Sequence, residues 1–319
     1  MAAEVGVVRL AEKLGKVEED KSAGQARMHG VSEHAAGGNH LALRQVMAYE
    51  LAMSINVSFS CALVTGASSG LGEEFAFQIA QRVGTLVLVA RREPLLLRLA
   101  DRIRAAFPQV VVAVFAVDLS HAAERDELVA TLTARGLLPD LLINNAGLGD
   151  YGEFISSDWR KLQSMLSVNI EALTHLTHEL VPEMIRRSGG AIVNVSSLAS
   201  VIPIPDFAVY AATKAYVTSF SEALRIELRE HRISVLAVCP GPVRTEFGQV
   251  ARRGENAPEM PSKKSFYVPK EQVVAESLAA VDRKAARVYP GLKTALAARF
   301  LSVLPLAVLR FLMSFRPRR

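Results

Sequence analysis

Cysteine is scarce in this chain of 319 residues, which contains only Cys61 and Cys239. Both lie in apolar runs, CALVTG and VLAVCPG, that are typical of buried strands. We therefore expect two core thiols and no disulfide, in a reducing compartment such as the cytoplasm.

The sequence also lacks long apolar segments and a large excess of one charge. Glu4, Glu12 and Glu18 occupy the N-terminal region, which has no apolar run, so we expect no secretory signal. The longest uncharged run near the C-terminus, 300–309, is far shorter than the ~20 residues of a membrane-spanning helix. The net charge is +5 without a basic stripe interleaved with aromatic residues, so nucleic-acid binding is not expected.

Clusters of metal-ligating residues are missing as well. The histidines at 29, 34 and 40 have no acidic or cysteine partner at ligand spacing, and we expect them to belong to a poorly ordered extension over residues 1–56. His175 and His178 lie three positions apart on a predicted helix, where a helix surface or subunit interface is favoured over a metal pair. We therefore predict no metal site.

Apolar residues, by contrast, form 50% of the chain, and its mean hydropathy is +0.22. From residue 58 onward, short and almost continuously apolar runs alternate with helical segments. The runs are CALVTG, TLVLVA, VVVAVFAVD, LLINNAG, AIVNVSS, ISVLAVCPG and ARVYPG. Because such strands are buried on both faces, the pattern predicts an α/β fold: a doubly wound, Rossmann-like parallel sheet of about seven strands with helices on both faces.

The alternation of strands and helices covers residues 57–292, which we predict to form one dinucleotide-binding catalytic domain. The expected helices lie near 70–83, 94–107, 121–135, 158–187, 208–230 and 270–284. Residues 293–319 are apolar and basic and are predicted to form a helical extension. Packing on a neighbouring subunit, shielding of a substrate pocket and peripheral contact with a membrane remain open as its role.

The first predicted strand–helix turn reads TGASSGLG, from Thr65 to Gly72. Its glycines at 66, 70 and 72 remove side chains where the chain turns tightly and where a pyrophosphate must approach the backbone. The helix that follows offers unpaired N–H groups and the positive end of its dipole. The turn therefore predicts a dinucleotide site.

The end of the second predicted strand indicates which dinucleotide binds. An acidic residue at this point would bind the ribose 2′-hydroxyl of NAD, whereas a basic residue accommodates the 2′-phosphate of NADP. Ala90 has no carboxylate, and Arg91 and Arg92 follow it. We therefore expect NADP(H) to be preferred over NAD(H).

Two further strand ends reach the same edge of the predicted sheet. Asp118, followed by Leu119, comes after the third strand, where a carboxylate can accept a hydrogen bond from an adenine amino group. The fourth strand ends in small and amide side chains that leave room for a ribose: Asn144, Asn145, Ala146 and Gly147. We expect both strand ends to contact the dinucleotide.

The candidate catalytic residues lie further along the chain. Tyr210 and Lys214 are one helical turn apart in VYAATKAYV, so both side chains lie on one face of a predicted helix. Ser197 ends the strand AIVNVSS thirteen residues before Tyr210, and Asn169 lies in SVNI on the preceding helix. These four residues form the candidate set.

Taken in order, TGASSGLG, NNAG, SVNI, VNVSS, YAATK and CPGPVRTEF resemble the motifs of short-chain dehydrogenases/reductases. The glycine spacing is similar to that of the single-domain main branch of this family, and differs from the extended epimerase-like branch. The Tyr-to-Lys spacing differs from that of the enoyl-reductase branch. The resemblance covers roughly residues 58–292.

The resemblance implies an oxidoreductase that interconverts a carbonyl compound and an alcohol, with a homodimer or homotetramer as its assembly. Tyr210 would be the acid/base, and Lys214 would lower its pKa and hold the nicotinamide ribose. Ser197 would bind the substrate oxygen, and Asn169 would help to hold a water relay. The candidate cofactor contacts, besides Tyr210 and Lys214, are Thr65, Gly66, Ser68, Ser69, Gly70, Leu71, Gly72, Arg91, Arg92, Asp118, Leu119, Asn145, Ala146, Gly147, Pro240, Gly241, Val243 and Thr245.

Two segments are expected to flank the substrate. The loop 198–209 is apolar and offers Ile202, Ile204 and Phe207, which favour a hydrophobic ketone or aldehyde, whereas the polar segment 247–269 is a candidate lid. The alternative hypothesis is a catalytically silent dinucleotide-binding sensor or scaffold. The intact catalytic set favours the enzyme.

Overall fold

A computed structural model of the chain describes residues 59–253, 266–305, 307–308 and 311. The predicted extension over residues 1–56 lies outside the described residues, as do residues 254–265 of the predicted lid and much of the predicted C-terminal extension.

The core of the fold is a seven-stranded sheet, and every pair of neighbouring strands in it is parallel. The strand order is β3-β2-β1-β4-β5-β6-β7. The strands are β1 (Phe59–Thr65), β2 (Val83–Ala90), β3 (Val111–Ala116), β4 (Leu141–Asn144), β5 (Gly190–Val195), β6 (Ile233–Val238) and β7 (Arg287–Val288). The predicted doubly wound parallel sheet is confirmed.

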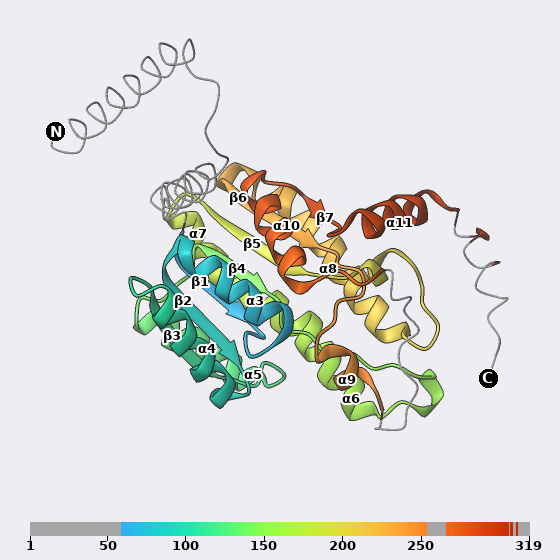
Figure 1. Cartoon of the computed structure of the whole chain (residues 1–319), viewed down its shortest axis with the longest axis horizontal. Helices are drawn as coiled ribbons and strands as arrows, with labels where there is room; N and C mark the ends of the chain where they lie inside the picture. Colours follow the sequence, from blue (N-terminus) through green and yellow to red (C-terminus); the bar gives the residue numbers. More distant parts are fainter. Residues whose placement is uncertain (1–58, 254–265, 306, 309–310, 312–319) are drawn as a thin grey trace, which may run out of the picture. The chain divides into compact units, whose positions relative to one another are not determined.

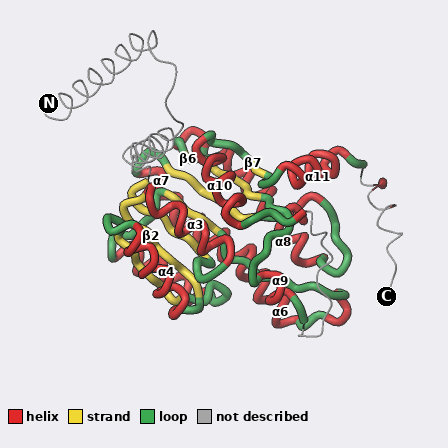
Figure 2. Tube along the Cα trace, viewed as in Figure 1, coloured by secondary structure: helices red, strands yellow, loops and turns green. Residues whose placement is uncertain are grey.

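Helices cover both faces of the sheet, as Figures 1 and 2 show. The apolar side chains of the strands are divided between two buried clusters, one on each face. One cluster is covered by α3 (Gly70–Ile79), α4 (Glu93–Ala106) and α10 (Lys270–Asp282), and the other by α5 (Ala122–Ala134), α7 (Leu173–Arg186) and α8 (Ala208–Glu227). Burial on both faces explains why the strands lack the alternating polar pattern of a half-exposed sheet.

The long helix predicted near 158–187 is interrupted. It consists of α6 (Trp159–Leu166), a π-helical stretch η3 (Ser167–Ala172) and α7. A π-helical insertion rotates the residues that follow it around the helix axis, and such insertions are frequent at functional sites. Here the stretch contains the buried Asn169.

The remaining short helices lie mainly at the two ends of the sheet. They are η1 (Ala80–Arg82), η2 (Phe154–Ser156), η4 (Leu198–Val201), η5 (Arg229–His231), α9 (Phe247–Ala251) and α11 (Leu292–Val303). The last of these begins the predicted C-terminal extension. None of the helices in the described part of the chain is long and apolar enough to cross a membrane.

The sheet has one point at which the direction of winding changes. Strand β1 pairs with β2 on one side and with β4 on the other, so the chain builds the sheet outward in one direction first and in the other afterwards. Loops that leave the carboxyl ends of β1 and β4 therefore diverge to opposite faces and leave a crevice between them.

Candidate active site

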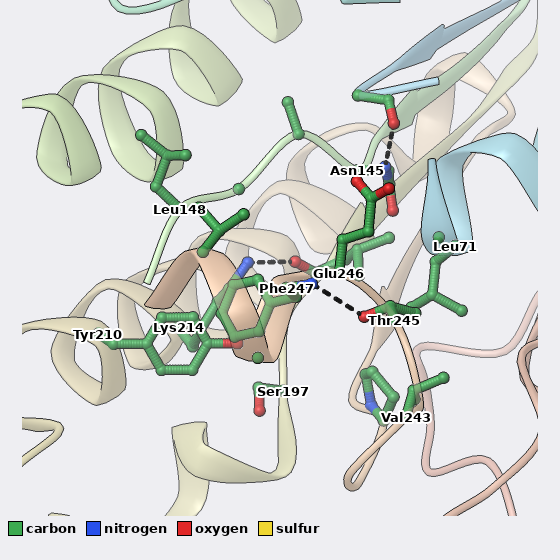
Figure 3. Close-up of a pocket in the computed structure, with 18 of the residues that line it drawn as sticks. Leu71, Asn145, Leu148, Ser197, Tyr210, Lys214, Val243, Thr245, Glu246 and Phe247 are labelled. Atoms are coloured by element: carbon green, nitrogen blue, oxygen red, sulfur yellow. Dashed lines mark hydrogen bonds between the residues drawn. The ribbon is translucent and has the colours of Figure 1, made fainter. Parts of the chain in front are cut away.

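A cavity of about 900 Å³ lies at the carboxyl ends of the strands (Figure 3). Its wall combines residues from the predicted cofactor loop with residues from the predicted catalytic set. The predicted residues that line it are Gly66, Ser68, Ser69, Gly70, Leu71, Arg91, Arg92, Asp118, Leu119, Asn145, Ala146, Gly147, Ser197, Tyr210, Lys214, Pro240, Gly241, Val243 and Thr245. Folding therefore brings these segments, distant in sequence, around one space.

Three of the predicted site residues do not line the cavity. Thr65 is buried beneath it, and its Oγ1 accepts hydrogen bonds from the N–H groups of Asn145 and Ala146, each 3.0 Å long. A Cβ on Gly72 would lie 2.2 Å from the main-chain oxygen of Gly66, so this glycine permits close packing of the loop on its own helix. Both residues hold the loop in position from behind. Asn169 is the third.

Asn144 was expected to bond either a loop or a ribose, and its side chain does not line the cavity. Its Nδ2 donates to Thr177 at 3.0 Å and to Asn194 at 2.9 Å, inside the layer between the sheet and α7. Asn144 is the last residue of β4, and its side chain points to the face of the sheet that α7 covers. Asn145, one residue further, is the one that lines the cavity.

The glycine turn forms a cradle that fits the phosphates of a dinucleotide. Gly66 and Gly70 have φ angles of +66° and +62°, which side chains rarely adopt. A Cβ on Gly70 would lie 3.2 Å from Thr245, across the cavity wall, and one on Gly147 would lie 3.4 Å from the Nζ of Lys214. Bare backbone therefore faces the cavity at Gly66 and Gly70, at the N-terminus of α3, and at Gly147, beside Lys214.

The two arginines after β2 lie at the same end of the cavity, each beside a carboxylate. The Nη1 atom of Arg91 is 3.7 Å from Oδ2 of Asp118, and Nη1 of Arg92 is 2.9 Å from Oε2 of Glu246. Partial burial alone would raise the pKa of Asp118, but hydrogen bonds from Ser120 and the charge of Arg91 outweigh it and lower the pKa. Asp118 is thus ionised at neutral pH.

At the opposite end, Ser197, Tyr210 and Lys214 converge (Figure 3). The Ser197 hydroxyl lies in the same cavity as the Tyr210 phenol and favours its ionised form. The Oγ of Ser197 also accepts a bond of 3.1 Å from the N–H of Ala199, which leaves the serine proton available for an acceptor. The Nζ atom of Lys214 lies 5.8 Å from the centre of the tyrosine ring.

Burial dominates the proton affinities of this set. It raises the pKa of Tyr210 to about 12, although the influence of the Ser197 hydroxyl lowers this pKa. It lowers the pKa of Lys214 to about 8. In the protein alone, desolvation of the phenolate outweighs the groups that favour it. The lowering of the tyrosine pKa by Lys214 together with the oxidised nicotinamide stays a prediction. The phenol is protonated at neutral pH.

Asn169 joins the cavity wall to the catalytic helix. Its Oδ1 accepts from the N–H of Leu148 at 2.8 Å, and its Nδ2 donates to the carbonyl of Leu148 at 2.9 Å and to Oγ1 of Thr213 at 3.0 Å. Thr213 in turn donates to the main-chain oxygen of Tyr210 at 2.7 Å. The amide thus positions the segment after β4 against α8.

An aromatic wall closes the cavity beside Tyr210, and part of it was missed from sequence. The rings of Phe207 and Tyr210 are stacked with their centres 4.2 Å apart, and the ring of Phe247 lies 5.3 Å from that of Tyr210. Tyr151 packs edge-on against Phe207 at 5.9 Å. Leu301 of α11 also lines the cavity. The signal for Phe247 was its place at the start of the predicted lid; Tyr151 carried none.

The expected loop residues take part in this wall. Ile202 and Ile204 line the cavity together with Phe207, as the apolar loop 198–209 predicts. The predicted lid differs from expectation at its described start, because Phe247 is an apolar wall residue rather than part of a polar cover.

A buried ion cluster ties α9 to the loop after β4. The guanidinium of Arg253 donates to both carboxylate oxygens of Asp150, with its Nη2 2.6 Å from Oδ2. Lys161 adds its Nζ at 3.3 Å from Oδ1, and the Asp150 side chain is only 2% exposed. Burial would raise the pKa of Asp150, but hydrogen bonds from Arg253 and Lys161 lower it. The cluster holds Phe247 over the cavity through the short helix α9.

The histidines of α7 have protein partners. The Nε2 atom of His175 is 3.3 Å from a carboxylate oxygen of Asp126, and Nδ1 of His178 is 2.8 Å from Glu179. Within the described residues, no group of three or more His, Cys, Asp or Glu side chains is arranged to hold a metal ion. The histidine cluster predicted in the N-terminal extension lies outside those residues.

A doubly wound sheet with a glycine cradle and a Ser–Tyr–Lys set at its carboxyl edge defines the class of dinucleotide-dependent oxidoreductases. Residues 60–256 match the family described as short chain dehydrogenase, and the chain belongs to this family.

Relatives and solved structures agree with the family assignment. A very-long-chain 3-oxoacyl-CoA reductase-like protein of Arabidopsis thaliana is 34% identical over 229 residues, which cover 69% of each chain. A short-chain dehydrogenase from Sphingobium yanoikuyae, solved in complex with NADPH, has a TM-score of 0.67 and 31% identity and covers 81% of this chain and 97% of its own. A bulky-bulky ketone specific alcohol dehydrogenase from Comamonas testosteroni has a TM-score of 0.65 and 29% identity and covers 81% and 95%.

Proposed function

We propose that this protein is an NADP(H)-dependent carbonyl reductase or alcohol dehydrogenase whose substrate is a hydrophobic ketone or aldehyde. One observation carries the proposal: Ser197, Tyr210 and the buried Lys214 share a cavity with the glycine cradle and two arginines. The alternative of a silent sensor or scaffold is not favoured, because such a protein has no need of the assembled set.

In the proposed reaction the nicotinamide supplies the hydride for reduction of the carbonyl carbon, or accepts it from the alcohol. Ser197 donates a hydrogen bond to the substrate oxygen and stabilises the negative charge that develops there. Tyr210 donates the proton that completes the alcohol, and its pKa of about 12 keeps it protonated at neutral pH. Lys214, beside the tyrosine ring, binds the nicotinamide ribose and favours the tyrosinate once the proton has left.

The cofactor is proposed to bind along the rest of the cavity. The cradle from Gly66 to Leu71 would hold the pyrophosphate, and Arg91 and Arg92 would hold the 2′-phosphate, which is why NADP(H) is preferred in this proposal. Asp118 and the segment 145–147 contact the adenosine, and the segment 240–245 closes over the nicotinamide.

The substrate end of the cavity supports a bulky apolar substrate. Phe207, Phe247, Ile202 and Ile204 offer ring and aliphatic surface beside the Tyr210 hydroxyl. The names of the relatives, a very-long-chain 3-oxoacyl-CoA reductase-like protein and an alcohol dehydrogenase specific for bulky-bulky ketones, are consistent with such a substrate. We propose a ketone that carries a long or bulky apolar group.

The experiment is NADPH and NADH oxidation with a panel of hydrophobic ketones and aldehydes. Tyr210→Phe removes the proton donor and is expected to lower kcat by a factor of about 10² to 10⁴. Tyr216→Phe is the matched control, because Tyr216 lies on the same helix but outside the cavity, where its hydroxyl is paired with Thr174. Unchanged rates in Tyr210→Phe would refute the proposed function.

The exposed face of α11 is relevant to the localisation and the oligomeric state of the protein. Leu292, Leu296 and Phe300 are 76%, 56% and 63% exposed and follow one another at helical spacing. We propose a homodimer or homotetramer in the cytoplasm in which a neighbouring subunit covers this face, with a membrane surface as the alternative. Liposome co-sedimentation distinguishes the two alternatives. If the full chain and a chain ending at Pro290 partition equally into the liposome pellet, contact of α11 with a membrane is ruled out.

A further inference from the structure

The arginines at the cofactor end of the cavity are neutralised by acids from other segments. Arg92 follows β2, and Glu246 follows β6, on the opposite side of β1 in the sheet. Their side chains nevertheless meet at 2.9 Å, and both line the cavity. The Nη2 of Arg92 also donates to Ser69 Oγ at 2.7 Å. Arg91 lies 3.7 Å from Asp118 in the same region.

The charges of these two ion pairs sum to zero. Two guanidinium groups contribute two positive charges, and Asp118 and Glu246 contribute two negative ones. Hydrogen bonding from Arg92 lowers the pKa of Glu246, so its carboxylate is ionised at neutral pH. A 2′-phosphate carries close to two negative charges at pH 7, as other phosphate monoesters do. The 2′-phosphate would therefore approach Arg92 while this arginine is already paired with Glu246.

We propose that Glu246 is a cofactor-specificity residue: as the counter-ion of Arg92, it weakens binding of the 2′-phosphate and so limits the preference for NADP(H) over NAD(H). The inference rests on the proposed function, in which Arg92 faces the 2′-phosphate. NAD(H) has an uncharged hydroxyl at this position. The carboxylate therefore opposes one cofactor and is nearly neutral toward the other.

A different role for the pair would give a different result. If the Arg92–Glu246 contact served as a strap that retains any bound dinucleotide, removal of the carboxylate would weaken NADP⁺ and NAD⁺ alike. If Glu246 only supported the fold, both affinities would change with stability. The ratio of the two dissociation constants separates these roles from the proposed one.

The experiment measures the dissociation constants of NADP⁺ and NAD⁺ by titration calorimetry on the full chain. Glu246→Gln keeps the size of the side chain and removes its charge. The pair is about half exposed, with side chains 47% and 50% accessible, and exposed ion pairs contribute up to about 1 kcal/mol. We expect NADP⁺ to bind about two- to five-fold more tightly, NAD⁺ to be unchanged, and the gain to shrink at high salt.

Two further variants make the result decisive. Glu222→Gln is the matched control, because it removes a carboxylate from a similarly exposed pair, with Arg287, outside the cavity. Arg92→Leu tests the basis of the proposal and is expected to weaken NADP⁺ alone. An unchanged or lower preference for NADP⁺ in Glu246→Gln, with Arg92→Leu behaving as expected, overturns only the role of Glu246. If Arg92→Leu leaves NADP⁺ binding intact, or the wild-type chain binds neither dinucleotide, the proposed cofactor assignment falls as well.

Discussion

The Nζ atom of Lys214 donates a hydrogen bond of 2.8 Å to the main-chain oxygen of Val195, at the end of β5 (Figure 3). The lysine side chain is almost fully buried, and the acceptor is a neutral carbonyl. Burial therefore lowers the pKa of Lys214 to about 8, with the electrostatic influence of Cys239 acting the other way. Burial in the folded protein therefore disfavours the charged form of Lys214.

This relationship predicts that Lys214→Met stabilises the fold near pH 7. A shift from 10.5 to about 8 corresponds to about 3 kcal/mol of unfavourable burial, from which about 1 kcal/mol is subtracted for the lost hydrogen bond. Between pH 8 and 10.5 the unfolded chain binds more protons at this site than the folded one, so the wild type gains stability as the pH rises. The advantage of the variant should shrink over the same range.

Urea denaturation of the wild type and Lys214→Met from pH 7 to 10 checks this prediction. Comparison of the two proteins cancels the contributions of Tyr210 and the cysteines, whose raised pKa values act in the opposite direction above pH 9. A difference between the two proteins that does not vary with pH would contradict the account.

Much of the fold could be predicted because its signals are local. Runs such as CALVTG and AIVNVSS are continuously apolar, and burial on both faces of a parallel sheet requires this. That Ser197, Tyr210 and Lys214 lie together could be predicted for a similar reason. The spacing of Tyr210 and Lys214 depends only on the helix period, and Ser197 ends a strand.

The rest depends on contacts that no local pattern encodes. Glu246 contacts Arg92 only after the strands have assembled into the sheet. Whether the pKa of Tyr210 is raised or lowered depends on how deeply the phenol is buried. The inward position of Asn169 arises within a π-helical stretch that apolar periodicity predicts as ordinary helix. Tertiary geometry decides each of these.

A second prediction concerns the size of the substrate. Phe247 packs 5.3 Å from the Tyr210 ring, so Phe247→Ala should open space beside the proton donor. We expect kcat/KM for bulky ketones to rise relative to small ones by about tenfold, since apolar groups in such pockets contribute about 1 to 3 kcal/mol. Phe154→Ala is the control, because Phe154 is 64% exposed and lies outside the cavity. The same ratio in both variants would show that Phe247 does not limit the substrate.

A third prediction concerns the ion cluster that holds α9. Arg253→Leu leaves the buried Asp150 with Lys161 as its remaining cationic partner, and should destabilise the protein by about 3 kcal/mol. Because α9 carries Phe247, the KM for the ketone should rise more than kcat falls. Removal of the charge in Asp150→Asn/Arg253→Leu should recover part of the stability. Urea denaturation and steady-state kinetics measure both effects. A double variant no more stable than Arg253→Leu would argue against the buried charge of Asp150, left with Lys161 alone, as the cause.

The last prediction compares two glycines that the structure treats very differently. A Cβ on Gly72 would lie 2.2 Å from the oxygen of Gly66 and 2.4 Å from Nδ2 of Asn145, whereas one on Gly136 would meet nothing within 4 Å. Gly72→Ala must therefore displace the cofactor cradle, and we expect a loss of about 3 kcal/mol or more together with the loss of NADP⁺ binding. Gly136 has a φ of +66°, which asparagine tolerates, so Gly136→Asn should cost about 1 kcal/mol and leave binding intact. Thermal denaturation and calorimetric titration of both variants test this prediction. Equal losses of stability and of NADP⁺ affinity in the two variants would mean that backbone flexibility, rather than the close contact between Gly72 and Gly66, explains the glycine at position 72.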